Sequence, residues 1–437
     1  MSGKPEVAII GAGYVGLTLA LHMASSGLRV LVVDRAEEKI SKLRMGKATI
    51  FEKKMEKTLR GCLDSRRLEF STTTSEGVPS WVIATPYVHD SKEDFTGVLD
   101  LVKGRGDKPP LIVIRTTVPS GYIRTRVLPE LERRFKGELD RDFYLSSAPE
   151  RTICGSALEE LRSLPQLVGG SSKSVGKTIR LFERSGTPCK PLSSLEAAEL
   201  SKLFSNFARF VQINLSNYFG VLCHQYGISE EVLINAIKES YPRLSFLCSP
   251  GPGAGGFCLP KDSLILQEGI KGMESTHFLR NLCNYPLYQY QLNEDVIQYH
   301  LHEVKEFIKD SKRVLAIGMA FKGIPQTDDT RSSVGVFIVR GLIQSGREVY
   351  VYDRSVSADK LRALQLPLAS NPLDLSGFDA LLLLNNDPGY RGILASAIST
   401  GTKKTIALYD PWRLLLKGGE SVFQRAFSCK DLRDRLQ

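Results

Sequence analysis

The sequence lacks several patterns that would each point to a particular class of function. Its eight cysteines include no Cys-x-x-Cys pair, which argues against a zinc ribbon or a thioredoxin-type redox centre. No apolar run reaches the ~18 residues of a membrane span, and Val7–Ile10 is expected to be a strand rather than the core of a signal peptide. These absences predict a cytoplasmic protein with reduced thiols, without a metal site and without membrane association.

Positive charge is in excess but is not concentrated anywhere in the chain. The formal net charge is +10 over 437 residues, yet no basic run is longer than pairs such as Arg66-Arg67 and Lys403-Lys404. A clustered basic stretch is the usual footprint of nucleic-acid binding, so its absence favours an anionic small molecule as the partner. The length and the 42% hydrophobic fraction predict two or three globular domains.

A glycine-rich turn lies between two expected strands near the N-terminus. It reads Gly11-Ala12-Gly13-Tyr14-Val15-Gly16 and opens an apolar helix, and the following strand ends at Asp34. In a dinucleotide-binding βαβ unit the first glycine makes the turn and the second lets the backbone reach the pyrophosphate. The third packs the helix on the strand, and the acid meets the ribose hydroxyls. The pattern predicts NAD as cofactor, with Arg35 beside Asp34 leaving NADP as the alternative.

Three more expected strands end in polar residues. Thr85, Thr117 and Glu150 each follow such a strand by a few residues. In a doubly wound sheet, ligands bind beyond the carboxyl ends of the strands, so all three residues are candidates for a cleft. For the threonines, a role as a cap or turn former is the alternative.

A helical pattern begins near Ser194 and is interrupted by a glycine-rich loop. On the helix, Glu199, Lys202 and Asn206 share a polar face, which could also be simply solvated. The first half of the loop, Pro250–Asp262, cannot be helix or central strand, and the loop delivers Cys258 beside a lysine and an aspartate. A neighbouring cation lowers the pKa of a thiol and makes it a better nucleophile; the alternative is a surface turn with an incidental cysteine.

A second α/β unit with a small parallel sheet is expected from Arg313 onward. It has no phosphate-binding glycine pattern. Lys322 and Arg331 lie between its first strand and its crossover helix, where they could grip an anionic ligand. The alternative is that they pair with Asp328 or Asp329.

Taken together, these motifs resemble the UDP-glucose and UDP-N-acetylhexosamine 6-dehydrogenases over nearly the whole chain. The resemblance implies an α/β protein with an N-terminal Rossmann NAD-binding domain (1–190) and a C-terminal Rossmann-like UDP-binding domain (301–437). Between them it implies a central all-helical dimerisation domain with the catalytic cysteine loop (191–300). It further implies a homodimer or larger homo-oligomer, a UDP-sugar substrate and a place in polysaccharide biosynthesis.

The implied reaction is the four-electron oxidation of the sugar C6 alcohol to a uronate through a cysteine thiohemiacetal and thioester. Catalytic roles fall to Cys258 as nucleophile, Lys202 and Asn206 at the oxyanion, Asp262 as base through a water, Glu150 as the group that positions water, and Thr117. Cofactor contacts fall to Gly11, Gly13, Tyr14, Val15, Gly16, Asp34, Lys39, Thr85, Thr117, Lys261 and Arg331. Substrate contacts fall to Glu150, Arg151, Lys202, Asn206, Leu247, Gly251, Gly255, Lys322 and, from the neighbouring subunit, Arg243.

The identity of the sugar stays open between two branches of the family. Phe257 stands where the N-acetylhexosamine branch usually has histidine, and Pro260-Lys261-Asp262 is nearer to the UDP-glucose branch. The Pro250-Gly251-Pro252-Gly253 opening favours the N-acetylhexosamine branch, so UDP-ManNAc or UDP-GlcNAc is expected and UDP-glucose is the alternative. Two rivals remain: a dehydrogenase that transfers a single hydride and needs no thiol, and a catalytically retired nucleotide-sugar-binding protein.

Overall fold

The computed structural model describes residues 4–89, 95–104, 108–273, 275–370, 374–398, 405–416, 420 and 422–428. The chain forms two compact units. Unit 1 comprises Met1–Asn206 and Leu264–Asn284, and unit 2 comprises Phe207–Ser263 and Tyr285–Gln437. The division falls inside three helices, α7 (Leu195–Gln225), α9 (Cys258–Gly269) and α10 (His277–Phe307), each of which contributes residues to both units.

Unit 1 is built on an eight-stranded sheet with the order β3-β2-β1-β4-β5-β6-β7-β8. Its strands pair in parallel except for β6 and β7, which are antiparallel. The strands are β1 (Val7–Ile10), β2 (Val30–Val33), β3 (Leu68–Ser71), β4 (Ser80–Ile83), β5 (Leu111–Ile114), β6 (Tyr144–Ser147), β7 (Gln166–Gly170) and β8 (Cys189–Leu192).

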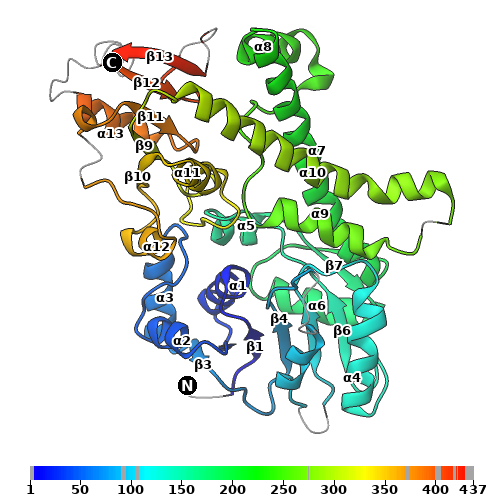
Figure 1. Cartoon of the computed structure of the whole chain (residues 1–437). Helices are drawn as coiled ribbons and strands as arrows, with labels where there is room; N and C mark the ends of the chain where they lie inside the picture. The colour runs from blue at the N-terminus through cyan, green and yellow to red at the C-terminus, as the bar shows by residue number, and fades with distance from the viewer. Residues whose placement is uncertain are drawn as a thin grey trace. The chain divides into compact units, whose positions relative to one another are not determined.

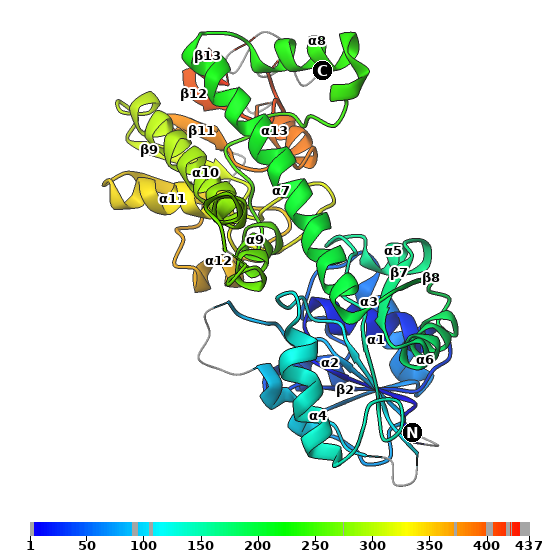
Figure 2. The same cartoon turned by 90° about the vertical axis from the view of Figure 1, so that its right-hand side faces the viewer.

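Helices cover both faces of this sheet, as Figures 1 and 2 show. Alternate residues of one strand point to opposite faces, so Val7 and Ile9 join one apolar cluster while Ala8 and Ile10 join another. This double burial explains why the central strands read as continuous apolar runs. The helical elements are α1 (Tyr14–Ser25), α2 (Glu37–Arg44), α3 (Met55–Asp64), η1 (Phe95–Leu101), η2 (Ile123–Val127), α4 (Leu128–Phe135), α5 (Ala157–Ser163) and α6 (Ser172–Glu183).

Unit 2 contains a second sheet with the order β10-β9-β11-β12-β13. The pairings among β9 to β12 are parallel, as the sequence predicts, but β13 joins the edge of the sheet antiparallel to β12. The strands are β9 (Arg313–Ile317), β10 (Glu348–Tyr352), β11 (Ala380–Leu383), β12 (Thr405–Tyr409) and β13 (Phe423–Ser428).

Two long helices pack together in unit 2 and run in the same direction. Asn214 of α7 donates a hydrogen bond to the carbonyl oxygen of Gln289 of α10 at 2.8 Å, and the His224 ring contacts the Tyr299 hydroxyl nearly three turns further along both helices. Figure 1 shows the two helices crossing. The other helical elements of unit 2 are α8 (Glu230–Ser240), η3 (Pro242–Leu244), α11 (Val334–Gln344), α12 (Ala358–Ala363), η4 (Leu375–Gly377) and α13 (Gly389–Ile398).

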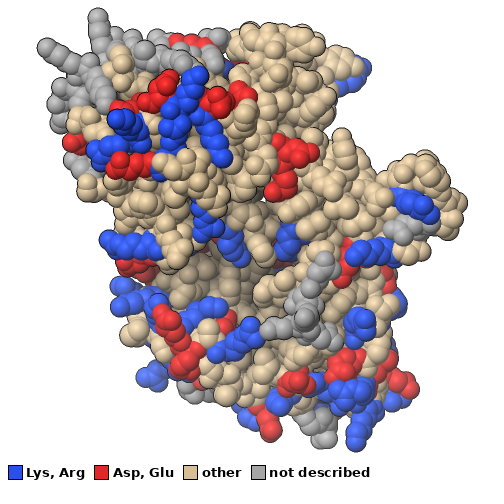
Figure 3. Space-filling view, in the orientation of Figure 1, with Lys and Arg blue, Asp and Glu red and all other residues tan. Residues whose placement is uncertain are grey.

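The charged side chains of both signs are interspersed on the face shown in Figure 3. Lysines and arginines there alternate with aspartates and glutamates and do not merge into one basic patch. Within the described ranges, no helix combines the length and the apolar character that a bilayer span requires.

Candidate active site

The glycine turn of unit 1 has the geometry that its sequence predicts. Gly11 has a φ of 105°, and a Cβ there would lie 2.9 Å from the carbonyl oxygen of Ala84 at the end of β4. A Cβ at Gly16 would lie 1.8 Å from the carbonyl oxygen of Gly11, so this glycine lets α1 pack against the turn. At Gly13, by contrast, no atom lies within 4 Å of the added Cβ. The turn is therefore closely packed on one side and open at the position predicted to meet the pyrophosphate.

Asp34 closes the turn from the end of β2. Its Oδ2 accepts hydrogen bonds from the Ala12 N–H at 2.8 Å and from the Lys39 ammonium at 2.8 Å. Burial alone would raise the pKa of this carboxyl, but Lys39 and the N–H groups of Ala36 and Ala12 outweigh it and hold the pKa below its ordinary value. The carboxylate is thus ionised and oriented beside the turn.

Two further observations in unit 1 bear on a bound dinucleotide. The Oγ1 of Thr85 is buried and makes no hydrogen bond to any described residue. The Tyr14 hydroxyl donates to Glu52, and the Gly155 N–H donates to the Tyr14 hydroxyl at 2.8 Å and to Glu52 Oε2 at 3.0 Å. Tyr14 therefore ties the glycine turn to Gly155, five residues after the predicted substrate residue Glu150, and Val15 beside it is half-buried. An ionised acid, an open glycine and an unsatisfied hydroxyl fit a dinucleotide at this edge of the sheet.

The predicted acid and base groups of unit 1 gather beyond the ends of β5 and β6. Glu150 is only 6% exposed, and the charge of Lys202 on α7 acts on it. Burial pushes the pKa of Glu150 up, but the charge of Arg115, hydrogen bonds and the charge of Lys202 together hold it below its ordinary value. Asn206 is buried one turn after Lys202, and Thr117 is half-buried after β5.

The predicted nucleophile lies in unit 2, at the start of a helix. Cys258 is the first residue of α9 and is exposed. The N-terminus of a helix carries partial positive charge and unpaired N–H groups, and both favour an anion at that position. One turn on, the Lys261 ammonium lies 2.5 Å from Oδ1 of Asp262, whose side chain is 1% exposed. The structure thus brings Cys258, Lys261 and Asp262 onto one helical turn.

The glycines before Cys258 let the loop pack against the segment between β9 and α11. The Gly256 N–H donates to the Ser332 carbonyl oxygen at 3.1 Å, and a Cβ at Gly256 would lie 2.7 Å from the Phe321 ring. A Cβ at Gly255 would lie 3.2 Å from the Ser332 carbonyl oxygen. Glycine is therefore required here by close contact with neighbouring backbone and ring atoms.

Phe257 lies between two of the predicted cofactor-binding cations. The guanidinium of Arg331 lies 4.6 Å from the centre of its ring and the Lys261 ammonium 5.5 Å, both within the range of cation–π attraction. Arg331 also pairs with Asp329 at 2.6 Å, which is the ion pair that the sequence offered as its alternative role. Lys322, the other candidate, lies over the Phe321 ring at 5.4 Å.

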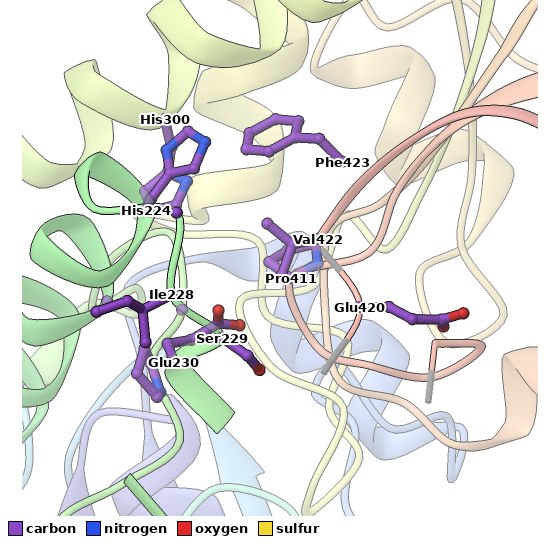
Figure 4. Close-up of a pocket in the computed structure, with 13 residues that line it drawn as sticks. His224, Ile228, Ser229, Glu230, His300, Pro411, Glu420, Val422 and Phe423 are labelled. Carbon is purple, nitrogen blue, oxygen red and sulfur yellow. The ribbon is translucent and has the colours of Figure 1, made fainter. Parts of the chain in front are cut away.

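One of the predicted substrate residues, Gly251, lines a cavity of about 190 Å³ in unit 2. Gly251 contributes to its wall and donates its N–H to Asn217 Oδ1 at 2.8 Å, while Leu247 is buried and Arg243 lies over the Tyr241 ring at 5.2 Å. Figure 4 shows the His224 and His300 side chains grouped with Phe423 at one end of the cavity. Neither histidine is predicted as a site residue from the sequence, because nothing near either of them in the chain indicates a site. Burial and the neighbouring His224 lower the pKa of His300 to about 3, so the His300 side chain is neutral at physiological pH. The lining residues are Gly220, His224, Gly227, Ile228, Ser229, Glu230, Pro250, Gly251, His300, Pro411, Glu420, Val422 and Phe423.

Comparison with known proteins assigns the three parts of the chain to one family. Residues 5–184 match the NAD-binding domain of the UDP-glucose/GDP-mannose dehydrogenases, residues 196–282 their central domain and residues 315–416 their UDP-binding domain. The chain belongs to the UDP-glucose/GDP-mannose dehydrogenase family. The predicted α/β fold class, the NAD cofactor and the assignment as an NAD-dependent nucleotide-sugar dehydrogenase are thereby confirmed. The domain boundaries 1–190, 191–300 and 301–437 stay a prediction.

Individual relatives match over nearly the whole length. The UDP-N-acetyl-D-mannosamine dehydrogenase of Pyrococcus horikoshii is 29% identical over 417 residues, which cover 92% of this chain and 94% of that protein. The structure of the UDP-D-ManNAc dehydrogenase from the same organism has a TM-score of 0.74 at 26% identity and covers 90% of this chain and 92% of that one. The structure of a UDP-glucose dehydrogenase from Pyrobaculum islandicum, at 24% identity, shares the fold with a TM-score of 0.78 and covers 98% of this chain and 99% of that one.

Proposed function

We propose that this protein oxidises C6 of a UDP-N-acetylhexosamine, with UDP-ManNAc as the first candidate, to the corresponding uronate. The observation that carries the proposal is Cys258, a thiol at the N-terminus of α9 with Lys261 and Asp262 on the same turn, in a chain with NAD-binding and UDP-binding family domains. A dehydrogenase that removes a single hydride has no use for such a thiol. The names of the curated relatives and the Pro250–Gly253 opening favour the N-acetylhexosamine branch over UDP-glucose.

The proposed mechanism depends on the fact that an aldehyde cannot give up a second hydride until a nucleophile has added to its carbonyl carbon. The residues predicted to hold NAD are Gly11–Gly16, Asp34, Lys39, Thr85, Lys261 and Arg331, and NAD bound there would supply the acceptor for the hydride that leaves C6 in each of two steps. After the first step the C6 aldehyde has no hydride to give unless a nucleophile adds to it. The Cys258 sulfur adds to form a thiohemiacetal, which loses the second hydride and becomes a thioester.

The remaining residues manage charge and water around that carbon. The Lys202 ammonium and the Asn206 amide stabilise the developing oxyanion. Asp262, through a bound water, removes the alcohol proton, and Glu150 with Thr117 orients the water that hydrolyses the thioester. Arg151, Leu247, Gly251, Gly255 and Lys322 contact the UDP-sugar.

We further propose a cytoplasmic homodimer or larger homo-oligomer that covers an apolar surface of unit 2. Tyr218 and Leu222 lie four residues apart on one face of α7 and are 43% and 38% exposed, and Tyr226, directly after the helix, is 79% exposed. Val232 and Leu233 of α8 are also exposed. Large apolar side chains exposed together are typical of a protein interface. The resemblance implies that Arg243 reaches the substrate of the neighbouring subunit in such an oligomer.

The experiment is a stoichiometric assay with purified protein and a panel of UDP-ManNAc, UDP-GlcNAc, UDP-glucose and UDP-galactose. We expect two NADH per sugar consumed and the highest kcat/KM with an N-acetylhexosamine. A ratio of one NADH would refute the double oxidation, and a preference for UDP-glucose would move the protein to the alternative substrate. Cys258→Ala should abolish uronate formation, and uronate made at the wild-type rate would remove the thioester from the mechanism.

A further inference from the structure

Arg115, the residue that follows β5, is a fully buried cation in unit 1. Its side chain is 0% exposed, and the four strand residues before it are apolar. Arginine is almost never fully buried without a paired anion, because an uncompensated charge in the interior is costly. Arg115, buried directly before the Thr116-Thr117 turn, is therefore expected to pair with a buried anion.

That partner is Glu150. The Nη2 of Arg115 donates a hydrogen bond to Glu150 Oε2, and the two side chains form a buried ion pair. Its Nη1 donates to Oε1 of Gln166 on β7 at 2.7 Å and lies 3.4 Å from the Ala148 carbonyl oxygen. The guanidinium also lies 5.5 Å from the centre of the Phe182 ring on α6. The arginine is thus fixed from three further elements and cannot swing away from the carboxylate.

The other oxygen of Glu150 is held as firmly. Oε1 accepts the N–H of Arg151 at 2.7 Å and the N–H of Thr152 at 2.8 Å. Both carboxylate oxygens are therefore engaged, one by a guanidinium and one by two backbone donors. This arrangement keeps the group ionised in spite of its burial, and the charge of Lys202 acts in the same direction.

We propose that Arg115 is a positioning residue for the oxidation: it holds Glu150 as a permanent, oriented anion beside Lys202. Glu150 then orients a water through the acceptor position that Oε2 has left and attracts the Lys202 ammonium by its charge, and it does not exchange a proton during turnover. Without the guanidinium, the buried carboxyl takes up a proton at a higher pH than in the wild type and loses that capacity when it does. The inference rests on the proposed function, because it concerns the rate of the same oxidation.

The test is the pH dependence of kcat for wild type, Arg115→Gln and Arg115→Lys. An opposite charge at this distance lowers the pKa of a carboxyl by about 1–3, so Arg115→Gln should move the acid limb of the profile toward neutral pH by about 1–3 pH units. Arg115→Lys retains the charge and should restore most of the limb, with a reduced kcat and an unchanged KM for NAD. Glu150→Gln should lower kcat across the whole pH range and remove the dependence on Arg115.

The control is Arg124→Gln, which removes an exposed arginine of the same unit that pairs with Glu196. Its profile should match wild type. A folded Arg115→Gln protein whose acid limb coincides with wild type would overturn the proposal, since a purely structural arginine changes the yield of folded protein and not the titration. If Arg115→Gln does not fold, Arg115→Lys decides: a kcat and profile equal to wild type would overturn the proposal as well. Absence of NADH from wild type with every UDP-sugar would instead refute the proposed function.

Discussion

Glu199 is a buried carboxyl that should make the stability of unit 1 depend on pH. It lies on α7, one turn before Lys202, and is 3% exposed. Its oxygens accept the N–H groups of Gly121 at 2.7 Å and Ile123 at 2.9 Å, at the start of the helical segment that follows Thr117. Burial raises the pKa of Glu199 to about 7, although the two N–H bonds act in the opposite direction.

The sign and size of the effect follow from that value. The pKa in the folded state lies above the ordinary 4.5, so the folded protein binds the proton more tightly than the unfolded chain does. The stabilisation of the folded protein by the proton on Glu199 is fully present below about pH 4.5 and is lost as the pH rises through about 7. A shift of this size corresponds to about 3 kcal/mol.

The perturbation is Glu199→Gln, which is uncharged at every pH. We expect thermal or urea unfolding of the wild type, measured from pH 5 to pH 8.5, to show a loss of stability on the order of 3 kcal/mol that the variant lacks. Glu196→Gln is the matched control on the same helix. The hydrogen bond from Arg124 lowers the pKa of Glu196 to about 2, so its contribution is lost only in acid and its slope in this range should equal that of wild type. Parallel slopes for wild type and Glu199→Gln would show that the N–H bonds outweigh burial and that the carboxyl is ionised throughout.

Two further predictions concern the cofactor. Gly16→Ala should prevent stable folding, because the added Cβ would lie 1.8 Å from a carbonyl oxygen. Gly13→Ala should fold normally, because the added Cβ meets only open space. The pyrophosphate is predicted to occupy that space, so this second variant should have a higher KM for NAD. Thermal unfolding and initial rates separate the two, and a normal KM in Gly13→Ala would contradict the predicted binding mode. Phe257→Leu should raise the KM for NAD about twofold to fivefold with little change in kcat, because it removes the ring that Arg331 and Lys261 share. Phe257→Tyr keeps the ring and should have the KM of the wild type. An unchanged KM in Phe257→Leu would show that the ring does not orient the two cations.

The parts of the fold that the sequence predicts correctly depend on short-range backbone geometry. The turn Gly11–Gly16 and the acid at the end of β2 are readable because a tight turn, a close helix approach and a strand end each restrict residue type locally. The strands β1, β2, β4, β5 and β9 to β12 are predicted for the same reason: each is a short, mostly apolar run between polar or glycine-containing segments. β6 is predicted from Phe143-Tyr144-Leu145, which overlaps its start, although the strand itself ends in two serines.

The strands that were missed lack that signal. β8 contains Pro191, which ordinarily argues against a strand, but β8 is at the edge of the sheet, where a missing N–H costs no ladder hydrogen bond. β7 ends in Gly169-Gly170, and a Cβ at Gly169 would lie 2.0 Å from the carbonyl oxygen of Ser194. The constraint on that glycine comes from a residue 25 positions away in the sequence, so no local pattern reports it.

The same limit applies to the charged residues of the site. Arg115 and Glu150 are separated by 35 positions, and Glu199 is 76 positions from Ile123. Each looks like an ordinary surface residue until the sheet brings its partner to it. One signal was available for Arg115: a charge directly after a strand of four apolar residues, all of them buried, has little access to water and must be paired.

In both sheets a glycine at the start of a helix packs against the carbonyl oxygen of an earlier glycine, but the segment between the two glycines differs. In unit 1, Gly16 packs against the carbonyl oxygen of Gly11 five residues earlier, and the short turn between them leaves Gly13 open. In unit 2, Gly335 packs in the same way against Gly318, but seventeen residues separate the two glycines, and the inserted segment contacts the loop before Cys258 instead of enclosing a phosphate site.

The acids at the ends of β2 and β10 differ correspondingly. Asp34 accepts one N–H from its glycine turn and pairs with Lys39. Asp353 accepts the N–H groups of Met319 and Ala320 at 2.7 and 2.9 Å and those of Ser355 and Val356 at 2.7 and 3.1 Å, so its four acceptor positions serve the backbone of unit 2. In unit 2 the glycine and the acid therefore serve the local backbone, and the segment between them packs against the loop before Cys258.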